Sequence, residues 1–200
     1  MRRSRAAAAL VAAAALAVTV SACGGTSSGA ATGSGSSVNP NAPEQNPSGD
    51  ISDNQAFVAV TAPSGLVTLK VPEGWARTGS GTTVTFTDKL NSVRLAQQPA
   101  AAAPTEASFR SGELPGLQKA TLGFQLRTVK AVTLPAGPAL RVDYAASSAP
   151  DPVTGKTVAQ DVERYELWRS GQQVVLTLSS PRGADNVDPW RVVTESVRWQ

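Results

Sequence analysis

The chain has 200 residues, of which 41% are hydrophobic and 16% are charged, and it contains one cysteine and no histidine. The absence of histidine excludes Ser-His-Asp and Cys-His catalysis, histidine metal sites and an imidazole pH switch. The formal net charge of +3 comes from Arg2, Arg3 and Arg5, since the other fifteen Lys and Arg equal the fifteen Asp and Glu. Without these three arginines no basic surface remains, and we expect no nucleic-acid partner.

The first segment of the chain has the layout of a secretory signal. The three arginines precede residues 6–20, which are nearly all Ala, Val and Leu. This run is too short for a transmembrane helix, which needs roughly 20 apolar residues to cross about 30 Å of hydrocarbon. We therefore predict that residues 1–22 are a signal peptide and are removed.

The single cysteine follows this segment directly. Val20, Ser21, Ala22 and Cys23 resemble the bacterial lipobox, in which an apolar residue and two small residues precede the cysteine. The resemblance implies a diacylglycerol on the Cys23 thiol, cleavage before Cys23 and a further acyl chain on the new terminus. One acyl chain gives only marginal binding, at about 0.8 kcal/mol per buried methylene, so two or more are needed for a stable anchor. The alternative is ordinary secretion, because the same small residues suit a general signal peptidase.

Residues 23–51 are predicted to be the lipid anchor and a flexible linker. The stretch from Gly24 to Asp50 holds six Gly, six Ser and three Pro and no aromatic residue, so it cannot bury a core. A coil of this length spans about 30 Å. Residues 52–200 are long enough for one domain that buries about 70% of its unfolded surface.

The first part of this domain reads as short strands. Alternating patterns occur in "AFVAV", in "LVTLKV" with Val67, Leu69 and Val71 on one face, in "TTVTFTD" and in "SVRLAQ". Such patterns predict an antiparallel meander with one buried and one solvated face.

A different pattern follows in "APTEASFRSGELPGLQKA". Thr105 is a suitable N-cap for a short helix that begins at Glu106, and Phe109 would face the core. Gly112 and Pro115 predict an interruption, with another helical turn after them.

The second half returns to strands, predicted over residues 124–134, 139–147, 157–169 and 173–180. The last segment predicts a helix with Asp188 as N-cap and Pro189 at the first helical position. The fold class is therefore α+β, an antiparallel sheet of six or seven strands packed with a mid-chain helix and a C-terminal helix.

The order of these elements resembles a known family. With "VPEGW" after the first long strand, "VERYELWRSGQQVVLTLSSP" as a late hairpin and "DPWRVVTESVRW" as the closing helix, the chain resembles the PsbP-like fold. It is also similar to the actinobacterial LpqN-type lipoproteins, in which "GELPGL" and "GKTVAQ" have counterparts. The likeness covers about three quarters of the chain by element order. It implies an envelope-facing binding module, and none of its motifs is catalytic.

Two motifs have a catalytic or ligand-binding interpretation that we weigh against a plain one. "VTGKT" at residues 153–157 ends like a phosphate-binding loop, but Pro150 stands where the first glycine is needed, so a hairpin turn is favoured. Asp161 and Glu163 share one face of a strand, as in a paired-carboxylate hydrolase. A solvated face beside Arg164 or Arg169 is the simpler interpretation.

The "ADNVD" stretch at residues 184–188 offers oxygen ligands for calcium, yet Asp188 is better used as a helix cap. Of the four tryptophans, Trp75, Trp190 and Trp199 are expected in the core. Trp168 lies on the strand face opposite Tyr165 and is the candidate for a partner contact.

These observations predict a non-enzymatic module, anchored by lipid to the extracytoplasmic face of the cell membrane. Its expected partner is an envelope lipid or a membrane-protein ectodomain, and we expect no cofactor, metal or catalytic residue. The alternative is a carboxylate-based hydrolase or transferase that acts on envelope carbohydrate. Two carboxylates facing each other across a concave site would favour the enzyme, whereas an apolar groove or flat patch would favour the binding module.

Overall fold

The computed structural model describes residues 48–200. The predicted signal peptide, Cys23 and the predicted linker up to residue 47 lie outside the described residues. Within the described part, no helix is long and apolar enough to cross a bilayer.

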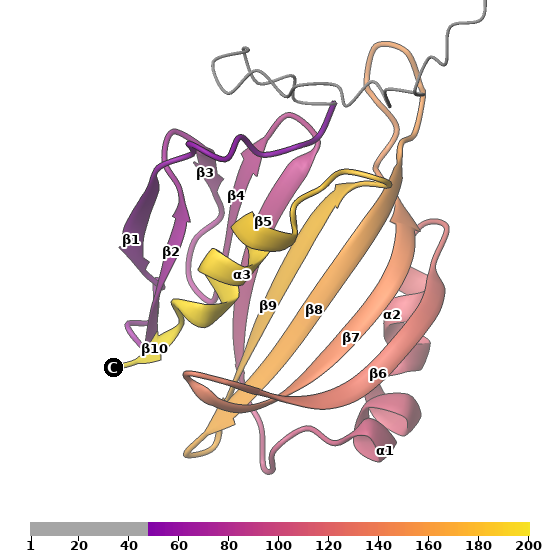
Figure 1. Ribbon diagram of the computed structural model, residues 1–200. Helices are drawn as coiled ribbons and strands as arrows, with labels where there is room; N and C mark the ends of the chain where they lie inside the picture. Colours follow the sequence, from indigo (N-terminus) through magenta and orange to yellow (C-terminus); the bar gives the residue numbers. More distant parts are fainter. Residues whose placement is uncertain (1–47) are drawn as a thin grey trace, which may run out of the picture. The chain divides into compact units, whose positions relative to one another are not determined.

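A seven-stranded antiparallel sheet forms the centre of the described chain, with the strand order β3-β4-β5-β9-β8-β7-β6 (Figure 1). Its strands are β3 (Ala76–Thr78), β4 (Thr83–Asp88), β5 (Asn91–Pro99), β6 (Gln125–Leu134), β7 (Gly137–Ser147), β8 (Ala159–Arg169) and β9 (Gln172–Pro181). The α+β prediction is confirmed, because the alternating runs fall on these strands.

The first two predicted strands do not join this sheet. They are β1 (Phe57–Thr61) and β2 (Val67–Pro72), which form a separate three-stranded sheet with β10 (Arg198–Trp199) in the order β1-β2-β10. Pro72 ends β2, and the chain returns through β3 into the larger sheet. The free edge of β2 is covered by the last residues of the chain, a pairing of distant segments that alternation alone does not reveal.

Helix α3 (Val187–Glu195) and β2 cover one half of one face of the larger sheet. Trp190, Val193 and Val197 are buried there against β4, β5, β8 and β9, as the helical spacing predicts. Trp75 packs edge-on against Trp190 with 6.2 Å between ring centroids, so both take core positions.

A helical segment covers the other face of the sheet (Figure 1). It consists of α1 (Glu106–Ser108), the π-helical turn η1 (Phe109–Glu113) and α2 (Leu114–Ala120). Thr105 is the predicted N-cap, and its hydroxyl accepts the N–H of Ser108 in a capping box. The predicted interruption is wrong: Gly112 is accommodated in the π-helical turn, and Pro115 lies in the first turn of α2, where its missing N–H is tolerated.

The start of α3 differs from the prediction. Asp188 lies in the first turn and pairs with Arg191 at 2.9 Å, while Asn186 holds the N-cap position without capping the helix by its side chain. The Asn186 amide instead accepts the N–H of Ile51 at 2.7 Å and donates to the Gly49 carbonyl at 2.9 Å. The helix therefore begins at Val187, two residues before the predicted first helical position at Pro189.

These contacts move the start of the packed domain upstream of residue 52. Ile51 is buried in the core, and the Asn91 side chain also donates to the Gly49 carbonyl, at 2.9 Å. Gly49 has a φ of +102°, and a Cβ at this position would lie 2.5 Å from Pro181, so only glycine fits there.

Candidate functional site

A groove of about 750 Å³ lies between the β4–β5 turn and the β7–β8 loop. Its lining residues lie on the face of the larger sheet that carries the helical segment, and at the end of the sheet where the described chain begins. Its principal lining residues are Thr85, Thr87, Lys89, Leu90, Ser92, Pro150, Pro152, Lys156, Val158, Gln160 and Ser179.

The floor of the groove is a row of hydroxyl groups. Thr87 is opposite Ser92, and Ser92 is opposite Ser179, so the three side chains lie on one face of adjacent strands. The hydroxyls of Ser92 and Ser179 are hydrogen-bonded at 2.7 Å. Thr85, two residues before Thr87, extends the row along β4. This floor offers donors and acceptors to a hydroxylated or phosphorylated ligand.

The first wall is the β4–β5 turn. Lys89 occupies the left-handed region with a φ of +50°, and the Asn91 amide fixes the turn to the incoming chain at Gly49. Leu90 is 36% exposed at the rim, and its carbonyl accepts a hydrogen bond from Gln160 at 3.4 Å across the groove.

The second wall is the β7–β8 loop, where the Asp151 side chain organises a turn. Its carboxylate accepts hydrogen bonds from the Val153 N–H at 3.0 Å and the Thr154 N–H at 2.7 Å. These bonds, with that of the Thr154 hydroxyl, lower the pKa of Asp151. The "VTGKT" stretch therefore belongs to a connection between two strands, without the helix that a phosphate-binding loop requires.

Two cations of the groove have no acidic partner. Lys89 and Lys156 are exposed, and neither takes part in an ion pair of the described residues. The carboxylate of Asp151, which also lines the groove, is engaged in its own turn. The groove thus combines a hydroxyl floor, an apolar rim and two ammonium groups available to a ligand.

The predicted carboxylates lie in a different hollow, of about 320 Å³, on the opposite face beside the start of α3. Asp161 pairs with Arg127 at 2.5 Å, and Glu163 pairs with Arg141 at 3.0 Å. The expected partners Arg164 and Arg169 are therefore wrong: the arginines come from β6 and β7, and Arg164 points to the other face of β8.

This hollow lacks the geometry of a hydrolase. The two carboxylates are two residues apart on one strand, so they project in parallel and do not face each other across a cleft. Tyr165 donates to Glu163 at 2.7 Å, and burial raises the pKa of the Tyr165 hydroxyl. Each carboxylate is thus part of a network of side chains that joins three neighbouring strands. No cluster within residues 48–200 is placed to hold a metal ion.

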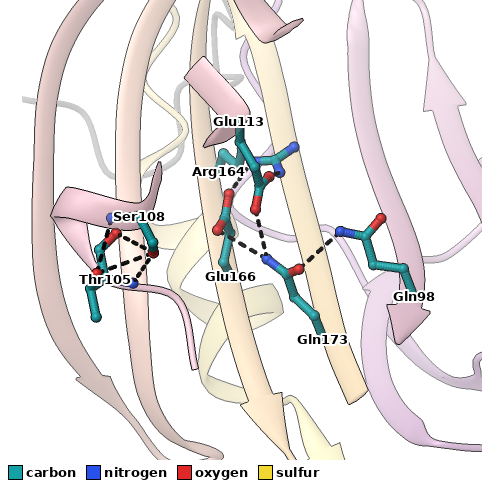
Figure 2. A network of polar contacts seen from close by, with 7 residues as sticks. All are labelled: Gln98, Thr105, Ser108, Glu113, Arg164, Glu166 and Gln173. Carbon is teal, nitrogen blue, oxygen red and sulfur yellow. Dashed lines mark hydrogen bonds and ion pairs between the residues drawn. The ribbon is translucent and has the colours of Figure 1, made fainter. Parts of the chain in front are cut away.

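Figure 2 shows a third group of polar residues, between the helical segment and the sheet. Arg164 forms ion pairs with Glu166 and Glu113, and the Gln173 amide donates to Glu166 at 3.0 Å. Glu166 is fully buried, with 0% exposure, and burial raises its pKa while Arg164 partly offsets that effect. This network holds η1 on the sheet, because Glu113 belongs to η1 and the others to β8 and β9.

Trp168 lies on the same face of β8 as Arg164 and Glu166. It is half-buried, and its indole N–H donates to the carbonyl of Ala100 at 2.8 Å. Tyr165 and Leu167, on the opposite face of β8, are buried in the core. A partner contact at Trp168 stays a prediction. The indole N–H is already hydrogen-bonded to Ala100, so such a contact would use the edge of the ring without its polar atom.

The residues of the groove were not singled out from the sequence. Lys89 and Lys156 lie in two turns that are far apart along the chain, and the approach of these turns depends on the strand order. The local signals were the "VTGKT" stretch, which we interpret as a hairpin turn, and the alternating hydroxyls in "TTVTFTD", which predict a polar sheet face but not what faces it.

The architecture defines the class of protein: an α+β domain with the PsbP-like fold. The solution structure of cyanobacterial PsbP (CyanoP) from Synechocystis sp. PCC 6803 matches with a TM-score of 0.52 and 11% identity, over 76% of this chain and 98% of that chain. Likeness at this identity shows the fold and leaves the ligand open.

Two other solved structures are more distant in shape. LpqN, involved in cell envelope biogenesis of Mycobacterium tuberculosis, matches with a TM-score of 0.43 and 17% identity, over 74% of this chain and 92% of that chain. A structure from Bacteroides thetaiotaomicron matches with a TM-score of 0.45 and 11% identity over 71% of this chain. It covers 48% of that chain, so this protein spans about half of its length. No family model and no curated protein matches the sequence.

Proposed function

We propose that this protein is a lipid-anchored extracytoplasmic binding module that holds the polar headgroup of an envelope lipid in the groove between the β4–β5 turn and the β7–β8 loop. The observation that carries the proposal is the composition of the groove: hydroxyls on its floor, two unpaired lysines and an apolar rim. An amphiphile has matching parts, because its headgroup needs hydrogen bonds and charge while the base of its chains needs apolar contact.

The sequence supports the placement of such a module at a membrane. The lipobox-like residues 20–23 provide the attachment point, and residues 24–47 separate Cys23 from the first described residue. A coil of this composition spans about 30 Å, which keeps the domain close to lipid targets and raises their effective concentration. A groove of modest affinity is sufficient under these conditions.

A non-enzymatic role is favoured over the hydrolase or transferase by the positions of the carboxylates. Asp161 and Glu163 lie outside the groove, side by side on one strand, and each is neutralised by an arginine. Neither is placed to act on a ligand in the groove. Accordingly, we propose that the captured lipid leaves the protein chemically unchanged.

Site-specific crosslinking in the native envelope tests the proposal. A photo-reactive residue at Thr87, inside the groove, is expected to give a lipid adduct that mass spectrometry of the full chain detects. The matched control is Thr83, which lies on the same strand and the same face but outside the groove.

Substitution of lysines in the same experiment measures how much the charges of the groove contribute to the adduct yield. Lys156→Ser is expected to lower the adduct yield at Thr87 by roughly ten- to a hundredfold, because losing a charge-assisted hydrogen bond costs about 1.5–3 kcal/mol. Lys130→Ser, an exposed lysine outside the groove, should leave the yield unchanged. Equal adducts at Thr83 and Thr87, a protein adduct alone, or a converted glycan that disappears with Asp161→Asn would each contradict a lipid-binding module.

A further inference from the structure

The most exposed large apolar side chains of the described residues lie in connections between elements or at the start of α3, whereas Val58 in β1 and Val192 in α3 are each 39% exposed. The three most exposed large ones are Val153 at 91%, Val187 at 69% and Leu122 at 55%. With Leu90 at the rim of the groove, they occupy three connections and one helix start: the β4–β5 turn, the α2–β6 connection, the β7–β8 loop and the first residue of α3.

The sheet brings these four positions to one end. Leu90 follows the end of β4, Val153 follows the end of β7, and Val187 follows the end of β9. In the antiparallel order of the sheet β4, β9 and β7 run in the same direction, each separated from the next by one strand, so their ends lie at the same end of the sheet. The Leu122 carbonyl accepts the N–H of Ser147, the last residue of β7, which places Leu122 at the same end. The β7–β8 loop projects beyond this end in Figure 1.

The chain enters the domain at this end as well. Gly49 is held by Asn91 in the β4–β5 turn and by Asn186 just before α3. All residues upstream of Ser48, Cys23 included, are therefore joined to the domain beside the apolar tips. A lipid-anchored chain brings this end, more than the opposite one, to the membrane surface.

The charges at this end show no excess of cations, since Asp50 lies here as well and its carboxylate accepts the N–H of Asp185. Each of three connections carries one cation and one acid, namely Asp88 and Lys89, Asp151 and Lys156, and Asp185 and Arg182. Electrostatic attraction to an anionic membrane surface is thus weak. The free energy of contact with a bilayer would come from insertion of apolar side chains.

We infer that this end of the sheet docks on the bilayer that carries the anchor, with Val153, Val187, Leu122 and Leu90 inserted among the headgroups. The inference rests on the proposed function, and it adds the orientation in which the groove opens toward its lipid. The tether supplies a high effective concentration, so a small apolar area is enough for docking.

The depth of a fluorophore tests this orientation in the complete, lipid-anchored chain. Val153→Cys, labelled with an environment-sensitive dye, is reconstituted in phosphatidylcholine vesicles that contain acyl-chain nitroxide lipid. The control label is at Ala102→Cys, an exposed position in the β5–α1 connection at the opposite end of the sheet. We expect lipid quenching at position 153 to be several-fold stronger than at 102, and iodide quenching to be weaker.

Two further arms separate docking from its alternatives. Val187→Asp with Leu122→Asp, both exposed positions, should reduce lipid quenching at 153 to the level at 102, and added salt should have little effect on the wild type. Strong iodide quenching of the label at position 153 would overturn docking. Weak quenching of this label by both iodide and nitroxide lipid would indicate a protein contact, and would also overturn docking. Either result leaves a lipid adduct at Thr87 standing, so the two proposals fail separately.

Discussion

Replacing Arg164 with methionine is expected to lower the free energy of unfolding by about 3–5 kcal/mol at pH 7, because it leaves a buried charge without its partner. Glu166 is fully buried, and Arg164 is the only cation that pairs with it in the described part of the chain. The same change removes the ion pair that joins η1 to β8. Denaturant unfolding monitored by tryptophan fluorescence measures the difference.

Arg127→Met is the matched control, since Arg127 pairs with Asp161 on the exposed side of the sheet. Exposed pairs contribute about 0–1 kcal/mol, so this variant should unfold close to the wild type. Equal losses for Arg127→Met and Arg164→Met would contradict a special role for the buried network.

The effect of Arg164→Met should depend on pH. Burial raises the pKa of Glu166 in the folded state, and Arg164 partly offsets that rise, so the variant holds the Glu166 proton more tightly still. The pKa of a glutamate in the unfolded chain is about 4.3. The destabilisation is therefore greatest at neutral pH, and it disappears as Glu166 becomes protonated in both the folded and the unfolded state. We expect the gap between variant and wild type to shrink from pH 7 toward pH 4, and a constant gap would contradict this origin.

Phe109→Ala is expected to cost about 3–5 kcal/mol, the usual range for removing a buried phenyl ring. Phe109 is 1% exposed and is the buried residue through which the helical segment packs on β6, β7 and β8. Thermal unfolding followed by circular dichroism checks the prediction, with Leu122→Ala, an exposed position, as the control expected within about 0.5 kcal/mol of wild type. A loss of similar size in both variants would show that the helical segment does not depend on this ring.

Much of the fold could be predicted from local patterns. The period-two alternation in β4, β7 and β9 marked the strands correctly, and Thr105 marked the start of the helical segment. These signals are local, because a cap or an alternating face acts over a few neighbouring residues.

The parts that could not be predicted depend on distant segments. The β2–β10 pairing joins residues more than a hundred positions apart. The Asn186 side chain does not cap its helix, because it is hydrogen-bonded to the backbone of Gly49 and Ile51. Glu166 is buried because η1 covers that face of β8, a contact that no local pattern in the sequence reveals.

The same reason explains the outcome for the candidate site. Asp161 and Glu163 were correctly placed on one strand face, but their arginine partners come from other strands. The groove needs two turns to meet across the sheet, and the one motif they carry, "VTGKT" in the β7–β8 loop, does not indicate the β4–β5 turn opposite it.

The mass and membrane partition of the mature protein test its lipid anchoring most directly. We expect the wild type to fractionate with membranes and to have the mass of residues 23–200 plus a diacylglycerol and an acyl chain. Cys23→Ser should be absent from washed membranes, either as an uncleaved precursor or as material in the medium, because loop docking without a tether loses its effective concentration. A Cys23→Ser protein that is cleaved before residue 23 and still fractionates with membranes, or a wild type of unmodified mass, would contradict the lipid anchor.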